Sequence, residues 1–195
     1  YSEDNLIEQT AIDLFFNRLG WDTQLAYNKE SFGEGSTLGR LNKKEVVLKE
    51  IFLDKLKEFN PNLPDQAYNQ AYEKLTEESI TKSLAEINYE KYQLLKEGIP
   101  VDYLEDAGNH TGLPQQIKNK TLKVFDFANH EKNNFLAVRQ LWIQGKSNRE
   151  RRPDIIGFVN GIPLLFIELK AAHRKLENAF NDNLTDYKDV IPKLF

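Results

Sequence analysis

Residues 151–170 have the sequence Arg-Arg-Pro-Asp-Ile-Ile-Gly-Phe-Val-Asn-Gly-Ile-Pro-Leu-Leu-Phe-Ile-Glu-Leu-Lys. Two apolar runs, 154–159 and 163–169, flank the dipeptide Asn160-Gly161. Asn-Gly between apolar runs is the strongest short-range signal for a β-hairpin, because both residues tolerate positive φ. We therefore expect two adjacent strands here. The second, with apolar residues at consecutive positions, is typical of a strand covered on both faces.

The ends of these strands carry residues suited to metal-dependent chemistry. Asp154 precedes Glu168 by fourteen positions, and Lys170 follows two positions later. Magnesium prefers carboxylate and carbonyl oxygens, which Asp154, Glu168 and the backbone carbonyl of Leu169 could supply. Such a metal polarises a scissile phosphate and lowers the pKa of a bound water. Lys170 lies on the same strand face as Glu168 and could position that water or stabilise the developing charge.

A structural alternative explains the same residues. A carboxylate directly after an apolar strand is costly to bury unless it is paired or binds a metal. A buried ion pair between Glu168 and Lys170, with Asp154 as a turn residue, would meet that requirement. The spacing alone is a loose pattern and does not decide between the two interpretations.

The rest of the chain predicts an α/β fold with a mixed sheet flanked by helices. Periodicity and breakers indicate helices over 4–19, 44–59, 64–75, 79–96 and 174–190, strands over 21–27, 99–104, 121–127 and 134–143, and loops over 30–40 and 105–120. The three successive helices between about 44 and 97 contain no chemical motif. We expect them to form a helical subdomain inserted into a single domain that spans 1–195.

The charge pattern gives a local rather than a global signal for DNA. Lysine and arginine number 26 against 30 acidic residues, so the chain lacks the basic excess of a DNA-coating protein. The segment 139–152, however, carries one acid, Glu150, against five cations: Arg139, Lys146, Arg149, Arg151 and Arg152. A solvated loop explains such a run. Its position directly before Asp154 makes DNA contact by Arg151 and Arg152 an equal alternative.

Composition excludes several other classes of site. The chain has no cysteine, which removes disulfides, thiolate metal sites and cysteine nucleophiles. Its three histidines are scattered, and the glycine-rich loop 30–40 lacks the lysine of a nucleotide-binding P-loop. No apolar stretch approaches the length that spans a bilayer. We expect a cytoplasmic protein without a membrane partner.

The motif and its surroundings resemble a known family. Pro153-Asp154, Glu168 and Lys170 resemble the PD-(D/E)xK nuclease superfamily, and Arg151–Ile155 with 158–164 resembles the N-terminal nuclease domain of the R subunit of type I restriction endonucleases. The similarity extends over nearly the whole chain, through 38–40 with 45–48, 122–127 with 133–135 and Gln140, and 179–195. The resemblance implies a restriction-endonuclease-like core.

The resemblance also implies roles for single residues. Asp154 and Glu168 would be metal ligands and Lys170 the catalytic lysine. Glu8, on the first helix, matches a glutamate that approaches the metal; a solvated helix acid is the alternative. Asn183 and Tyr187 match a Gln-x-x-x-Tyr motif on the last helix, with an arm shorter by one methylene at Asn183. Such residues touch the lysine or the DNA backbone, although Tyr187 could equally be a half-buried core tyrosine.

The implied function is a magnesium-dependent endonuclease module within an ATP-dependent, DNA-translocating complex. Double-stranded DNA and the modification and specificity subunits would be its partners, and ATP would be used by motor domains outside this fragment. Two alternatives stay open: a stand-alone repair nuclease of the same superfamily, and a non-catalytic interaction domain. We expect the fragment alone to cut weakly or not at all at a defined site.

Overall fold

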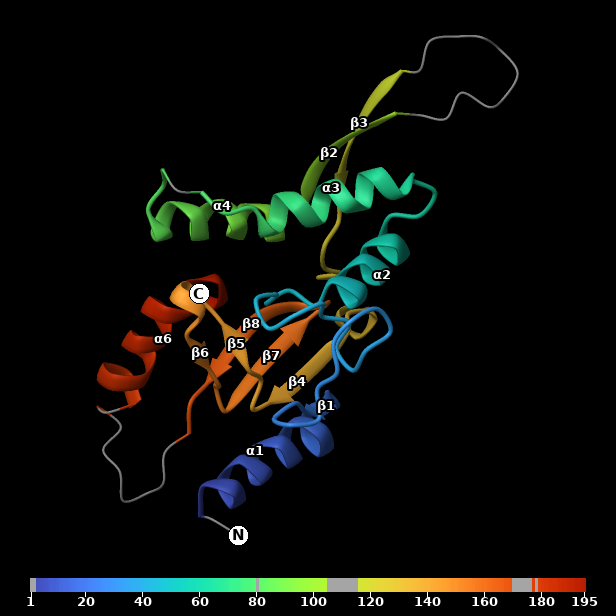
Figure 1. The fold of residues 1–195 in the computed structure, drawn as a ribbon. Helices are drawn as coiled ribbons and strands as arrows, with labels where there is room; N and C mark the ends of the chain where they lie inside the picture. The colour runs from blue at the N-terminus through green and yellow to red at the C-terminus, as the bar shows by residue number, and fades with distance from the viewer. Residues whose placement is uncertain (1–2, 80, 105–115, 170–176, 178) are drawn as a thin grey trace. The chain divides into compact units, whose positions relative to one another are not determined.

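The computed structural model describes residues 3–79, 81–104, 116–169, 177 and 179–195 (Figure 1). The chain divides into two compact units, one formed by Tyr1–Glu50 with Asn134–Phe195 and the other by Ile51–Asn133. Within the described residues, each helix is too short or too polar to cross a membrane.

The first unit is built on a mixed sheet, as expected. Its strand order is β1-β4-β7-β8, with bounds β1 (Asp22–Leu25), β4 (Phe135–Arg139), β7 (Ile155–Val159) and β8 (Ile162–Ile167). β1 and β4 are parallel, whereas β4–β7 and β7–β8 are antiparallel. The β7–β8 hairpin is therefore confirmed. The expectation that its second strand is covered on both faces is wrong, because Leu164 and Leu165 of β8 are exposed.

The Asn160-Gly161 turn has the backbone geometry that its residues favour. The φ angles are 51° at Asn160 and 78° at Gly161. The buried Asn160 side chain also accepts a hydrogen bond from the backbone N–H of Asn134 at 2.7 Å. The Gly161 carbonyl accepts one from Leu48 at 2.8 Å. The turn is thus held by neighbouring segments as well as by its own sequence.

Helix α1 (Glu3–Leu19) packs against this sheet (Figure 1). Ile12 and Phe15 form a buried cluster with Ala137 of β4 and Ile155 of β7. The ring of Trp21 lies 5.0 Å from that of Phe15, between centroids. The expected helix over 4–19 is confirmed, and its packing fixes α1 beside the strand that follows Asp154.

The expected single strand over 134–143 is wrong beyond Arg139. Gln140 adopts a left-handed backbone with φ 56°, which ends β4. The chain then forms β5 (Ile143–Gln144), the 3-10 turn η2 (Lys146–Asn148) and β6 (Glu150–Arg151), and β5 and β6 pair antiparallel.

The C-terminal segment begins in the described residues with the π-helix η3 (Ala179–Leu184), followed by α6 (Thr185–Val190) and the 3-10 turn η4 (Pro192–Leu194). The expected helix over 174–190 is confirmed from 179 onward. Its residues 174–176 and 178 lie outside the described part of the chain.

The second unit combines helices with a strand pair. Its elements are α2 (Lys49–Phe59, which starts in the first unit), α3 (Asp65–Thr76), α4 (Leu84–Glu97), β2 (Ile99–Leu104), β3 (Ile117–Leu122) and η1 (His130–Lys132). β2 and β3 are antiparallel, and α3 packs on β2. The expected strand over 121–127 is wrong, because the strand occupies 117–122, four residues of which had been expected as loop.

Two helix starts also differ from expectation. Residues 44–48 are not helical, although Val46, Val47 and Leu48 are buried. Helix α4 starts after Ser83, later than expected, because Ser83 and Glu86 form a capping box that satisfies the first N–H groups.

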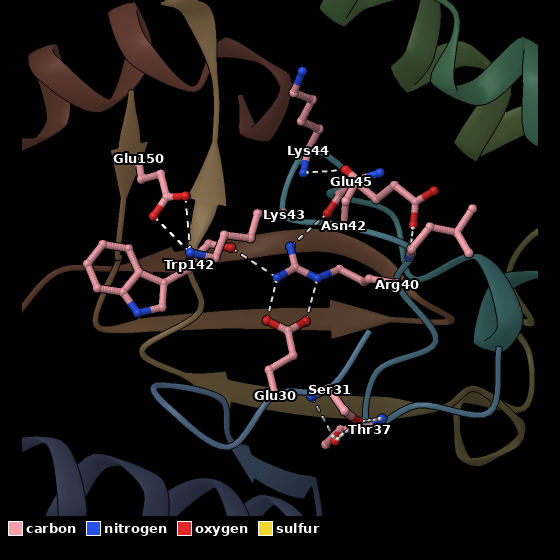
Figure 2. Close-up of polar contacts among 11 residues, drawn as sticks. Glu30, Ser31, Thr37, Arg40, Asn42, Lys43, Lys44, Glu45, Trp142 and Glu150 are labelled. Atoms are coloured by element: carbon pink, nitrogen blue, oxygen red, sulfur yellow. Dashed lines mark hydrogen bonds and ion pairs between the residues drawn. The ribbon is translucent and has the colours of Figure 1, made fainter. Parts of the chain in front are cut away.

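A buried arginine holds the irregular segment between β1 and α2 (Figure 2). The Arg40 side chain is fully buried, and its Nε and Nη2 donate to the two carboxylate oxygens of Glu30, each at 2.7 Å. Its Nη1 donates to the Glu45 carbonyl at 2.8 Å, and Nη2 to the Trp142 carbonyl at 2.9 Å. One side chain thus ties the expected 30–40 loop to the segment that precedes β5.

Candidate active site

Asp154 and Glu168 are brought together by the register of the hairpin. Ile155 of β7 lies opposite Ile167 of β8, so the next cross-strand positions are Asp154 and Glu168. The Oδ2 atom of Asp154 accepts a hydrogen bond from the backbone N–H of Leu169 at 2.7 Å. The two acids, far apart in sequence, therefore lie at the same end of adjacent strands.

Glu168 is further held by the C-terminal helical segment. The Asn183 side-chain amide donates to Glu168 Oε1, and Tyr187, one helical turn later, hydrogen bonds to the same carboxylate. Tyr187 is buried, and its ring packs edge-on against Phe166 of β8 with centroids 5.5 Å apart. Both members of the expected motif thus contact Glu168.

The pKa of the Tyr187 phenol is shifted by its burial and by both carboxylates of the site, Glu168 and Asp154. Burial raises the pKa of its phenol strongly, and the charges of Glu168 and Asp154 and the hydrogen bond to Glu168 raise it further. Tyr187 therefore stays neutral and acts as a hydrogen-bond donor at neutral pH. It is buried, as a core tyrosine would be, but its hydroxyl serves the acidic site.

Glu8 lies in the same neighbourhood and is not a solvated helix acid. Its side chain is buried and accepts hydrogen bonds from Gln140 Nε2 at 2.9 and 2.8 Å, with Arg139 Nε 3.9 Å away. The backbone N–H of Gln140 donates to the Asp154 carbonyl at 2.9 Å. Gln140 thus links Glu8 to Asp154, and its left-handed backbone serves both contacts.

The oxygen atoms at this site are of the types that bind a hard divalent cation such as magnesium. Asp154, Glu168 and the Leu169 carbonyl are the ligand types that magnesium takes. The described residues contain no group of three or more His, Cys, Asp or Glu side chains already placed to hold a metal. Glu8 accepts hydrogen bonds from Gln140, and its approach to the metal stays a prediction. Lys170 lies outside the described residues.

Several cations of the 139–152 segment form ion pairs. Arg151 binds Asp186 of α6 through Nε and through Nη2, the latter at 2.7 Å, and Arg149 binds Asp189 at 2.9 Å. The hydrogen bond between Arg151 and Asp186 raises the pKa of Arg151 and lowers that of Asp186. These pairs fasten α6, which carries Tyr187, to the segment before Asp154.

Sequence reasoning did not assign roles to Gln140, Asp186 or Asp189. The family resemblance covered Gln140 and 179–195 but assigned no role to these three residues. Asp186 and Asp189 lie three residues apart, on neighbouring positions of a helix surface, which indicates that they pair with basic residues without identifying them.

The fold and the site together define an α/β protein whose mixed sheet presents two acids at the end of a hairpin, held by a helical asparagine and tyrosine. The family described as "Type I restriction enzyme R protein N terminus" matches residues 1–195, and the chain belongs to this family.

Individual relatives agree with this assignment. The chain is 33% identical, over 98% of its length, to the type I restriction enzyme HindI endonuclease subunit of Haemophilus influenzae. It is 29% identical, over 100% of its length, to the putative type I restriction enzyme MjaIXP endonuclease subunit of Methanocaldococcus jannaschii. The chain spans 17% and 18% of these two relatives, respectively. The expected family membership is confirmed.

Proposed function

We propose that this chain is the magnesium-dependent endonuclease module of a type I restriction enzyme R protein and hydrolyses DNA phosphodiester bonds. The observation that carries the proposal is the convergence of Asp154 and Glu168 at the end of β7 and β8. The names of the relatives, which are endonuclease subunits, support it. The PD-(D/E)xK interpretation of the motif is part of the same proposal.

Each residue of the site has a task in this reaction. Asp154, Glu168 and the Leu169 carbonyl would hold Mg²⁺, which when bound supplies Lewis acidity and a water of lowered pKa. Asn183 and Tyr187 orient the Glu168 carboxylate through their hydrogen bonds. Gln140 fixes the backbone at Asp154 and holds Glu8 close by. Lys170 is proposed to position the attacking water.

The proposed setting is a larger assembly. The relatives are more than five times as long as the matched region, which leaves room for an ATP-driven motor. Modification and specificity subunits would read the DNA sequence. The net charge of −4 supports this arrangement, because an acidic chain gains little non-specific affinity for the DNA backbone.

Metal binding provides a direct test. Isothermal titration of the 195-residue chain with Mn²⁺ should show binding that is lost in Asp154→Ala, because one of the two carboxylates is gone. Asp102→Ala removes an exposed acid of β2 and serves as the matched control, with binding unchanged. Equal binding by wild type and Asp154→Ala, or none by wild type, would contradict the proposal; the latter outcome favours a non-catalytic interaction domain.

A further inference from the structure

The cations around β6 differ in how their charge is compensated. Three of them form ion pairs with carboxylates: Lys43 with Glu150, Arg149 with Asp189 and Arg151 with Asp186. These charges are already neutralised within the protein. A phosphate that bound there would have to displace an acid.

Arg152 is held in a different way. Its guanidinium carbon lies 4.7 Å from the ring centroid of Tyr27 and 5.2 Å from that of Trp142. Within the described residues, it makes no ion pair with an acid and no side-chain hydrogen bond. The face of an aromatic ring attracts the guanidinium cation, but it does not act as a hydrogen-bond acceptor for the N–H groups in the guanidinium plane. The positive charge of Arg152 and the N–H donors of its guanidinium group are therefore available to bind an anion.

The position of Arg152 is fixed relative to the acidic site. Only Pro153, which is buried, separates it from Asp154. A residue before proline is confined to extended backbone, and proline fixes its own φ. Arg152 and Asp154 lie in the short link between β6 and β7, and two residues of chain span at most about 7 Å. Arg152 is thus placed beside Asp154 while its side chain is restrained by the two rings.

We propose that Arg152, held by Tyr27 and Trp142, binds a phosphate of the DNA backbone next to the scissile one, and that Arg149 and Arg151 do not. This inference rests on the proposed function. A planar guanidinium matches a phosphate with two parallel hydrogen bonds. Restraint by the rings lowers the conformational entropy lost on binding. Tyr27 and Trp142 are positioning residues in this arrangement.

DNA binding can be measured separately from cleavage. Fluorescence anisotropy with a fluorescein-labelled 20-base-pair duplex, in EDTA and at low salt, should show an affinity about tenfold weaker for Arg152→Ala than for wild type. The slope of log affinity against log salt should fall by about one. Lys146→Ala removes an exposed cation from the same segment and is the matched control, with affinity and slope nearly unchanged.

The rings give a second, independent readout. Tyr27→Phe keeps the aromatic face and should bind as wild type does, whereas Tyr27→Leu should weaken binding. Tyr27→Leu should add little to Arg152→Ala, because both remove the same contact. Arg152→Lys keeps the positive charge but loses the planar pair of N–H donors, so its DNA affinity should lie between those of wild type and Arg152→Ala. Thermal unfolding of each variant checks that it is folded.

The outcomes separate this inference from the proposed function. Equal losses in Arg152→Ala and Lys146→Ala, an unchanged salt slope in Arg152→Ala, or no measurable binding by wild type would overturn the inference. Additive losses in the double variant would overturn the role of Tyr27. If the chain inside its full assembly does not cut DNA although Arg152→Ala weakens binding, the proposed function fails, and of the inference only the contact between Arg152 and a DNA phosphate stands.

Discussion

Replacing Glu168 with alanine should reduce DNA cleavage by at least about a thousandfold, because the metal that it helps to hold supplies several kcal/mol of transition-state stabilisation. The change also removes the carboxylate that Asn183 and Tyr187 hold in place. Cleavage of a plasmid substrate by the full R protein, assembled with its partner subunits, measures the effect. ATP hydrolysis should be preserved, because the motor is proposed to lie outside this chain.

The control for this experiment is Glu131→Ala, which removes an exposed glutamate from the second unit. It should cut as wild type does. Cleavage at the wild-type rate by Glu168→Ala would remove Glu168 from the catalytic machinery. Loss of both cleavage and ATP hydrolysis in Glu168→Ala would instead indicate that the complex fails to assemble. Glu168→Gln, which has nearly the same side-chain volume, identifies this case, because it should lose cleavage and keep ATP hydrolysis.

Replacing Arg40 with alanine should lower the free energy of unfolding of the first unit by about 3–5 kcal/mol, the typical result of breaking a buried ion pair. Glu30 is left buried without its partner, and the carbonyls of Glu45 and Trp142 each lose a donor. The two tryptophans of the chain, Trp21 and Trp142, both lie in this unit, so urea unfolding followed by tryptophan fluorescence reports on it.

Arg149→Ala is the matched control for Arg40→Ala. It breaks an exposed arginine–aspartate pair of the same unit, which contributes less than about 1 kcal/mol. A shift of the urea midpoint in Arg40→Ala no larger than in this control would show that the buried pair does not hold the 30–40 loop.

The parts of the fold that follow from local sequence were predictable. The hairpin was predictable because Asn160-Gly161 favours the turn and its neighbours are apolar. The helix over 4–19 was predictable because its apolar residues recur with a helical period. In contrast, β3 was missed, because its residues 117–121 are exposed and lack the apolar alternation that marks a strand.

Other differences depend on contacts that a local pattern does not contain. Val46–Leu48 continue the apolar period of α2, but they are buried as irregular chain in a segment held by Arg40. β4 ends before Gln140, and that residue hydrogen bonds to Asp154 and to Glu8, the latter 132 positions away. Tertiary contacts of this kind override the periodic signal.

The same distinction applies to the site. The hairpin itself was predictable, but its turn alone would place Asp154 opposite Ile167. A register shift between Gly157 and Phe158, which the sequence did not predict, moves the position opposite Asp154 to Glu168. The role of Gln140 and the ion pair between Arg151 and Asp186 did not follow, because they join segments far apart in sequence. The basic segment was predicted as a unit, but the structure separates its paired arginines from Arg152.

Asp154 and Glu168 are proposed to share a divalent cation, and locating that cation is the most direct test. Crystals of the chain grown with Mn²⁺ should show an anomalous scattering peak at roughly 2 Å from a carboxylate oxygen of both residues. A peak at other acids, or none at this pair while both side chains are well ordered, would contradict the account.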